Sequence, residues 1–289
     1  MNNNLQTITA KLWAMANKLR GNMSASDYKD YILAFMFYRY LSERQEAYLL
    51  GGDVLDLIEE QSLNEAYKAQ ASGDDLGDYL QDISATLGYA INPENTWVSI
   101  IEKIDSNQLI PSDYQMIFDS FNHNCQLNAA AEQDFKGLFS DINLSHSQLG
   151  SSTTSRTRAL SSIVKLVDDV EYKSEDGKDI LGEIYEYLIG QFAANAGKKG
   201  GEFYTPHQVS KILAKLVTHN VAPSKHAFSV YDPAMGSGSL LLTVRGELPG
   251  GEKEGAITFY GQELTTSTYN LARMNLMMHG VNYHNMTLH

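Results

Sequence analysis

Residues 228–239 have the sequence Phe-Ser-Val-Tyr-Asp-Pro-Ala-Met-Gly-Ser-Gly-Ser. The first five form a mostly apolar run that predicts a buried strand, and the glycine-rich turn after it leads into a predicted helix over residues 237–246. A second strand is predicted over residues 257–263, and a second helix over residues 266–279. Strand, helix, strand and helix at this spacing predict a parallel, doubly wound α/β sheet.

The turn after the first predicted strand carries Gly236 and Gly238, which let the backbone approach a ligand closely. Nicotinamide and flavin enzymes use similar turns, so the glycines alone do not identify the ligand. Asp232 stands at the end of the strand, directly before the turn. A carboxylate there repels a pyrophosphate and attracts a ligand with a cationic amino acid end. A plain tight turn without a ligand is the alternative.

Glu263 ends the second predicted strand. An acid in this place can accept hydrogen bonds from both hydroxyls of a ribose, as in dinucleotide sites. The position therefore predicts an adenosine-bearing ligand without saying which one. A solvated acid at a strand end is the alternative.

Residues 200–207, Gly-Gly-Glu-Phe-Tyr-Thr-Pro-His, precede another predicted helix. Thr205 is predicted as its N-cap, Pro206 as its first residue, and Gln208 as the partner of Thr205 in a capping box. We expect this turn to lie over the ligand, with helix amides near a carboxylate and an aromatic ring near a sulfonium cation. One buried face is predicted for the helix that follows: Val209, Ile212, Leu213, Leu216 and Val217.

The first half of the chain has helical patterns throughout. Apolar residues recur at helical spacing from Ile8 to Leu19, and Ser24 with Asp27 predicts a capping box before the dense apolar run at residues 31–41. That run predicts a helix at the centre of a bundle. The small polar residues 150–155 predict a linker. We therefore predict a helical amino-terminal domain over residues 1–150 and part of an α/β domain over residues 151–289.

The composition restricts the partners and the compartment. The longest apolar run, at residues 31–38, is too short to span a membrane, and the amino terminus lacks the features of a signal peptide. The single cysteine, Cys125, excludes an internal disulfide, fits a reducing cytoplasm and is predicted to be buried. With a formal net charge of −13 and no strong basic cluster, the chain is not expected to grip DNA by itself. His279, His284 and His289 are five residues apart, which predicts no metal site.

A cationic methionine-like end, a ribose and an adenine together describe S-adenosyl-L-methionine. Phe-Tyr-Thr-Pro ahead of Asp-Pro-Ala-x-Gly-Ser-Gly resembles the cofactor signature of the modification subunit of type I restriction–modification systems, an N6-adenine DNA methyltransferase. Further segments resemble the helical amino-terminal domain of that family and the helix that enters its catalytic domain: residues 12–13, 19–21, 27–29, 37–42 and 180–193.

The resemblance implies a Rossmann-like methyltransferase domain that depends on S-adenosyl-L-methionine. Position 207 is often arginine in the family and is histidine here, so a charge contact at that place is not implied. Asp232 and Gly236 belong to the matching motif. The cofactor contacts implied by the match are Glu202, Phe203, Tyr204, Thr205, Pro206, His207, Ser237, Gly238, Ser239 and Glu263.

The sequence departs from the family in one respect. The catalytic signature, Asn-Pro-Pro followed by an aromatic residue, should come after the third strand, where it holds the amine of a flipped-out adenine. The sequence contains no Pro-Pro and ends at His289, near the expected start of that strand. We therefore expect no catalytic residue in this segment, no methyl transfer by it alone, and a longer natural enzyme.

The family picture also implies partners. A separate specificity subunit reads double-stranded DNA between two modification subunits, and a restriction (nuclease) subunit joins for cleavage. Three alternatives remain open from the sequence. One is a self-contained adenine methyltransferase of another type, which should carry its own basic DNA-reading segment. The others are a non-catalytic assembly module and a nicotinamide-binding Rossmann enzyme with the same glycine turn.

Overall fold

The computed structural model describes residues 9–10, 12–17, 25–51, 54–170, 172, 180–222, 226–251, 253, 255–281 and 284–288. The chain divides into two compact units. The first joins Met1–Leu33 to Val170–His289, and the second comprises Ala34–Asp169. The predicted domain boundary at residue 150 stays a prediction, because a compact unit need not coincide with a domain.

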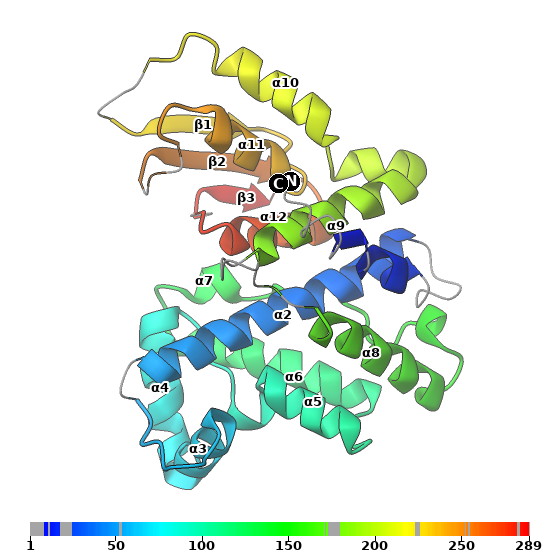
Figure 1. Ribbon diagram of the computed structural model, residues 1–289, viewed down its shortest axis with the longest axis vertical. Helices are drawn as coiled ribbons and strands as arrows, with labels where there is room; N and C mark the ends of the chain where they lie inside the picture. The colour runs from blue at the N-terminus through cyan, green and yellow to red at the C-terminus, as the bar shows by residue number, and fades with distance from the viewer. Residues whose placement is uncertain are drawn as a thin grey trace. The chain divides into compact units, whose positions relative to one another are not determined.

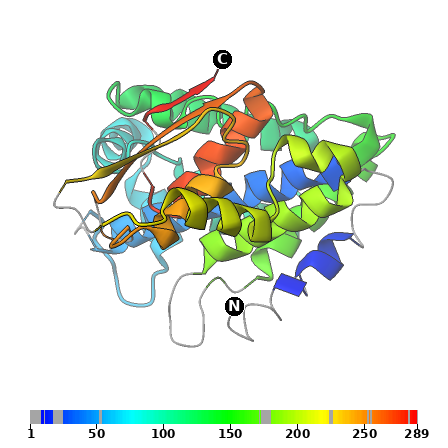
Figure 2. The same cartoon turned by 90° about the horizontal axis from the view of Figure 1, so that it is seen from above.

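The first unit contains a three-stranded parallel sheet (Figures 1 and 2). Its strands β1 (Phe228–Asp232), β2 (Ile257–Glu263) and β3 (Met286–Leu288) follow one another in that order. Phe228 pairs with Ile257, and Gly261 pairs with Met286. Both predicted strands are confirmed at their predicted bounds, and the predicted α/β class is confirmed with them.

Helices α10 (His207–Val217), α11 (Ser239–Glu247) and α12 (Thr266–Met278) pack against one face of this sheet. The apolar side chains of Val230 and Phe259 meet them there. On the opposite face Tyr231 is 57% exposed and Tyr260 is 41% exposed. The prediction that β1 is a buried strand is therefore wrong, because the helices cover only one side of it and its residues alternate between half-buried and exposed.

Helix α9 (Leu181–Asn195) also belongs to the first unit, and the short 3-10 segment η5 (Gly197–Glu202) follows it. The apolar face predicted for α9 is confirmed. The buried members are Leu181, Ile184, Tyr185, Leu188 and Phe192.

The start of α10 differs from the predicted cap. Pro206, with an extended ψ of 135°, is the N-cap residue, and no side chain caps the helix. The Pro206 carbonyl accepts hydrogen bonds from the amides of Val209 and Ser210. Thr205 therefore lies one residue before the cap, and its predicted capping box with Gln208 is wrong.

The apolar face predicted for α10 exists, but it is not buried. Ile212 is 60% exposed and Leu216 is 67% exposed, and Val209, Leu213 and Val217 are exposed as well. The buried residues of α10 are the small ones, Ser210 and Ala214. The helix contacts α11 and β1 through Ala214, because the small side chain permits close approach. The spacing of apolar residues identified a face without showing what covers it.

The second unit is helical. Phe118 and Phe139 stack with ring centroids 4.4 Å apart, and Phe35, Tyr38 and Phe121 pack around this pair. Cys125 is buried, as predicted. The helices, of which α2 begins in the first unit, are α2 (Ala25–Gly51), α3 (Leu63–Gln70), α4 (Leu76–Leu87), α5 (Trp97–Asp105), α6 (Pro111–Asn124), α7 (Glu132–Phe135) and α8 (Thr153–Asp168).

Helix α2 confirms the prediction of a helix that is apolar on nearly every side, because all side chains at residues 31–38 are buried. Residues 9–10 and 12–17 are helical, whereas the predicted stop at Gly21 and the capping residue Ser24 lie outside the described residues. The stretch at residues 150–155 is only partly a linker. Ser152 caps α8 and forms a capping box with Ser155.

None of the helices in the described parts of the chain is both long enough and apolar enough to cross a membrane.

The exposed face of α10 leads to a prediction about stability. Ile212→Ala and Leu216→Ala should each change the free energy of unfolding by no more than about 0.5 kcal/mol, because exposed side chains lose little burial. Leu188→Ala, in the buried face of α9, should cost about 2–5 kcal/mol. Urea unfolding of the three variants measures the difference. Equal losses at Leu216 and Leu188 would contradict the exposure of α10.

Candidate functional site

The glycine turn joins β1 to α11, and its backbone requires glycine at two positions. Gly236 has φ of +56° and Gly238 has φ of +77°, both in the left-handed region. A Cβ atom at position 236 would lie only 2.8 Å from the carbonyl oxygen of Phe203. The turn therefore touches the backbone of the 200–207 segment, and the two predicted motifs lie side by side.

Five consecutive backbone amides of this turn already have acceptors inside the protein. An anionic ligand such as a pyrophosphate normally binds to open amides at this kind of turn. None of these five is open here, so this stretch of the turn is a poor phosphate site, whereas α11, which begins at Ser239, has no side-chain cap. The bonds run from Ala234 to Asp232 Oδ1 (3.0 Å), Met235 to the Gln262 carbonyl (2.9 Å), Gly236 to Glu263 Oε2 (3.2 Å), Ser237 to the Phe203 carbonyl (2.8 Å) and Gly238 to the Met235 carbonyl (2.9 Å).

Glu263 fastens the end of β2 to the glycine turn. Its Oε2 accepts from the Gly236 amide, and its Oε1 accepts from the amides of Leu264 (2.8 Å) and Thr265 (3.0 Å). The carboxylate is half-buried at the carboxyl end of the sheet. The Thr265 hydroxyl also donates to Oε1 (3.3 Å), so four donors meet the roughly four lone-pair sites of this carboxylate. A ligand hydroxyl would therefore take the place of the Thr265 hydroxyl, the longest of the four bonds. The predicted contact of Glu263 with a ribose stays a prediction.

Asp232 is half-buried at the end of β1, one strand away from Glu263. Its Oδ1 accepts from the amide of Ala234, which fixes the carboxylate beside the turn. Two carboxylates thus stand at the carboxyl ends of neighbouring parallel strands. This is the edge of an open α/β sheet at which ligands bind.

The 200–207 segment reaches the turn through its backbone. Phe203 is buried, and the ammonium group of Lys29 lies 4.9 Å from the centroid of its ring. One face of this ring therefore already meets a cation of the protein, which leaves less room for the predicted sulfonium contact. Tyr204 is half-buried, and its hydroxyl packs against Gly190 of α9.

The predicted site residues differ in accessibility. Glu202, Pro206 and His207 are exposed, and Thr205 is half-buried. In the glycine turn, by contrast, all four predicted residues from 236 to 239 are buried: Gly236, Ser237, Gly238 and Ser239. The structure thus brings the glycine turn, Glu263 and the Phe203 backbone together. Tyr204, Pro206 and His207 line a neighbouring space instead.

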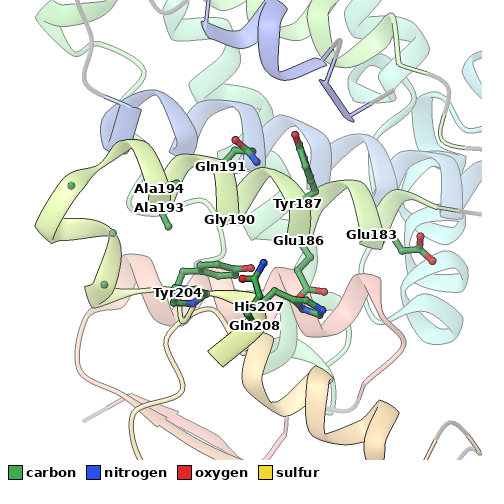
Figure 3. Close-up of a pocket in the computed structure, with 14 residues that line it drawn as sticks. Glu183, Glu186, Tyr187, Gly190, Gln191, Ala193, Ala194, Tyr204, His207 and Gln208 are labelled. Carbon is green, nitrogen blue, oxygen red and sulfur yellow. The ribbon is translucent and has the colours of Figure 1, made fainter. Parts of the chain in front are cut away.

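That space is a cavity of about 810 Å³ between α9 and residues 200–208. Figure 3 shows Glu186 pointing from α9 toward the segment that carries Tyr204 and His207. The glycine turn does not appear in the described lining. The candidate ligand site lies at the turn, beside the carboxylates of Asp232 and Glu263, and the cavity is next to it.

Glu186 is a site residue that the sequence did not single out. Burial raises the pKa of its carboxyl from 4.5 to about 7, a hydrogen bond from the Ser239 hydroxyl opposes the rise, and the charge of Glu183 adds to it. His279 Nε2 lies 3.9 Å from Glu186 Oε2. Burial and the nearby Glu186 also raise the pKa of Tyr204. In the sequence, Glu186 is one acid in an amphipathic helix, and only the fold brings it to Ser239.

In the described part of the chain, no group of three His, Cys, Asp or Glu side chains could hold a metal ion.

Two family models match the chain. The model described as HsdM N-terminal domain matches residues 8–167, more than half of the chain, and the model described as N-6 DNA Methylase matches residues 176–289. The chain belongs to the methyltransferase subunits of type I restriction–modification systems. The resemblance inferred from the motifs is therefore confirmed.

Individual members of the type I methyltransferase subunits agree with this assignment. The MpnII methylase subunit of Mycoplasma pneumoniae is 35% identical over 97% of the chain and 51% of its own length. The MjaIX methylase subunit of Methanocaldococcus jannaschii is 24% identical over 93% of the chain and 45% of its own length. The chain thus spans about half the length of these two relatives.

A crystal structure gives the same result. The type I methyltransferase subunit from Streptococcus thermophilus superimposes with a TM-score of 0.80 at 31% identity, covering 99% of the chain and 58% of that structure. This likeness confirms the predicted fold class, a helical amino-terminal part followed by the first part of a methyltransferase sheet.

The geometry of the glycine turn predicts how a methyl group at position 236 changes the stability of the protein. Gly236→Ala should lower the free energy of unfolding by at least about 1 kcal/mol, because alanine is strained at positive φ and its Cβ meets the Phe203 carbonyl. Gly201→Ala is the matched control in the adjoining motif, since a Cβ there meets nothing within 4 Å. Chemical unfolding measures both, and an equal effect at the two positions would contradict the close approach.

The raised pKa of Glu186 predicts a dependence of stability on pH. The folded protein holds this proton more tightly than the unfolded chain, so the stabilisation is complete below about pH 4.5 and is lost as the pH rises through about 7. Glu186→Gln should remove a decline on the order of 3 kcal/mol between these limits. Urea unfolding at pH 5 and pH 8 tests this. An unchanged pH dependence in the variant would contradict the raised pKa of Glu186.

Proposed function

We propose that this chain carries the S-adenosyl-L-methionine site of a DNA N6-adenine methyltransferase subunit of a type I restriction–modification system. The site would lie at the carboxyl ends of β1 and β2. The proposed cofactor-binding residues are Glu202, Phe203, Tyr204, Thr205, Pro206, His207, Asp232, Gly236, Ser237, Gly238, Ser239 and Glu263.

The observation that carries the proposal is the pairing of the five turn amides beside two carboxylates. Such a site is unfavourable for a phosphorylated ligand. Asp232 would hold the ammonium group of the methionine end, and Glu263 would accept from the ribose hydroxyls. Leu264, next to Glu263, is 78% exposed and offers an apolar contact to the adenine ring. A nucleoside with a cationic amino acid end fits all three features.

Methyl transfer needs the adenine amine to attack the methyl carbon in line, which depends on alignment more than on a strong base. The Asn-Pro-Pro signature that would hold this amine does not occur in the 289 residues. The proposed role of the chain is therefore to bind and orient the cofactor. Catalysis is assigned to an assembly that supplies the adenine-holding residues.

The formal net charge of −13 supports the proposal that other chains make most of the contacts to DNA. An acidic protein gains little from phosphate contacts, which dominate affinity for DNA. We propose that a specificity subunit provides most of the contact to double-stranded DNA and that a restriction subunit joins for cleavage. The proposed location of this assembly is the cytoplasm, where S-adenosyl-L-methionine and the DNA are both present.

Calorimetric titration with S-adenosylhomocysteine and, separately, with NAD tests the cofactor class. S-adenosylhomocysteine should bind and NAD should not. Asp232→Asn and Glu263→Gln should each weaken binding roughly tenfold or more, because each removes a charge-assisted hydrogen bond. Glu59→Gln, an exposed carboxylate of the second unit, is the control and should bind as the unchanged chain does. Binding of NAD in place of S-adenosylhomocysteine would overturn the proposal.

A second arm tests the reaction. Transfer of a radioactive methyl group to adenine in duplex DNA should be absent with this chain alone and should appear only when an adenine-holding segment and a specificity subunit are added. Transfer to DNA by the chain alone would contradict the proposal that other parts of the assembly hold the adenine and the DNA.

A further inference from the structure

Asn275 of α12 bonds to the glycine turn with its side chain. The residue is 0% exposed, and its Nδ2 donates to the Ser237 carbonyl over 2.9 Å. The next residue of α12, Leu276, is also buried, and its side chain lies 3.3 Å from the place where a Cβ at Gly238 would stand. Two adjacent residues of α12 therefore contact the turn at Ser237 and Gly238.

The backbone of Ser237 is bonded at both of its polar groups. Its amide donates to the Phe203 carbonyl (2.8 Å), and its carbonyl accepts from Asn275. On either side stand Gly236 and Gly238, with φ values of +56° and +77°. Glycine adopts left-handed and right-handed conformations about equally well, so the glycines alone do not fix the peptide planes of the turn. The two hydrogen bonds at Ser237 supply that constraint.

The side-chain amide of Asn275 serves this carbonyl in one orientation only. Its Oδ1 is buried and has no hydrogen-bond partner among the described residues. Rotation of the amide by 180° would place Oδ1 against the Ser237 carbonyl, where two acceptors repel each other. A buried acceptor without a donor also costs free energy of folding. An apolar side chain would avoid that cost, so the reason for an asparagine here lies in its bond to the turn.

A second buried asparagine of α12 has a different partner. Asn270 is 3% exposed, and its Oδ1 accepts from Nη1 of Arg273 (3.1 Å), three residues further along the same helix. Asn270 thus bonds within α12, whereas Asn275 bonds from α12 to the turn. The pair provides a comparison in which the helix and the residue type are the same.

We propose that Asn275 is a positioning residue for the cofactor, whose side-chain amide fixes the Ser237–Gly238 peptide in the orientation that binds S-adenosyl-L-methionine. Ser237 and Gly238 are among the proposed cofactor contacts, so the direction of their shared peptide decides what the turn presents to the ligand. Without the bond, binding must also order this peptide, which lowers the affinity. This inference rests on the proposed function, because it takes S-adenosyl-L-methionine as the ligand of the turn.

Asn275→Asp makes the bond to the turn depend on pH. A protonated carboxyl can donate to the Ser237 carbonyl, whereas an ionised one only accepts and is repelled by it. Burial disfavours the ionised form, so the pKa of the introduced carboxyl should lie well above its ordinary value of about 3.9. Calorimetric titration with S-adenosylhomocysteine should show nearly unchanged affinity at pH 5.5 and a loss of roughly tenfold or more at pH 8.

The unchanged chain is titrated at the same two pH values, and the ratio of the two affinities removes the contributions of other titrating groups. Such groups include His279, whose Nδ1 lies 2.8 Å from the Asn275 carbonyl, and Glu186 of α9, 3.9 Å from Nε2 of His279. Glu263 of β2, which accepts from the Gly236 amide, is a third. A change in the ratio therefore reports on the introduced carboxyl.

Asn270→Asp is the matched control, because it introduces the same group into the same helix beside Arg273. Its affinity relative to the unchanged chain should be the same at both pH values. Asn275→Leu keeps the branched shape of the side chain but removes the donor. It should bind S-adenosylhomocysteine about fivefold to tenfold more weakly at both pH values, and its Ser237 and Gly238 amides should exchange hydrogen faster than in the unchanged chain.

Three results would overturn the positioning role while leaving the proposed cofactor intact: a constant ratio for Asn275→Asp, an equal pH dependence in Asn270→Asp, or full affinity of Asn275→Leu. If Asn275→Asp does not fold, Asn275→Leu decides through its affinity and amide exchange. Loss of folding in both variants would also overturn the role, because α12 itself would then require the residue. A complete lack of S-adenosylhomocysteine binding to the unchanged chain would instead overturn the proposed function and this inference with it.

Discussion

The arrangement at the site depends on the internal pairing of the amides in the glycine turn. Each amide from Ala234 to Gly238 donates to a group of the protein, and the acceptors come from β1, β2, the turn itself and Phe203. A stretch held in this way offers none of its five amides to a phosphate. Beside it stand the half-buried carboxylates of Asp232 and Glu263, and these suit a ligand that is cationic at one end and carries a ribose.

The same pairing explains why residues far apart in sequence form one site. Gly236 brings the turn against the Phe203 carbonyl, and Glu263 bonds to the Gly236 amide. The side chain of Asn275, on α12, donates to the Ser237 carbonyl. Four segments thus position a turn of a few residues, and disturbance of any one of them should displace the others. On α9, burial raises the pKa of the Glu186 carboxyl to about 7.

Much of the fold followed from local patterns, because strand length and glycine position are properties of short segments. The bounds of β1 and β2, the buried stripe of α9 and the cluster at Asp232, Gly236 and Glu263 could be predicted. The exposure of α10 could not, since a periodic apolar face does not reveal what covers it. Thr205 was misplaced by one residue, because Pro206 fits the cap as well as the first turn. Glu186 was missed because only tertiary packing brings it to Ser239.

The central claim is that the turn amides are satisfied before any ligand arrives. Amide hydrogen exchange of the ligand-free chain, resolved at residues 234–238, tests it most directly. The account predicts slow exchange at all five positions, comparable to the paired residues of β2. Exchange as fast as in an exposed loop would show open amides, and it would contradict the argument for a ligand without phosphate.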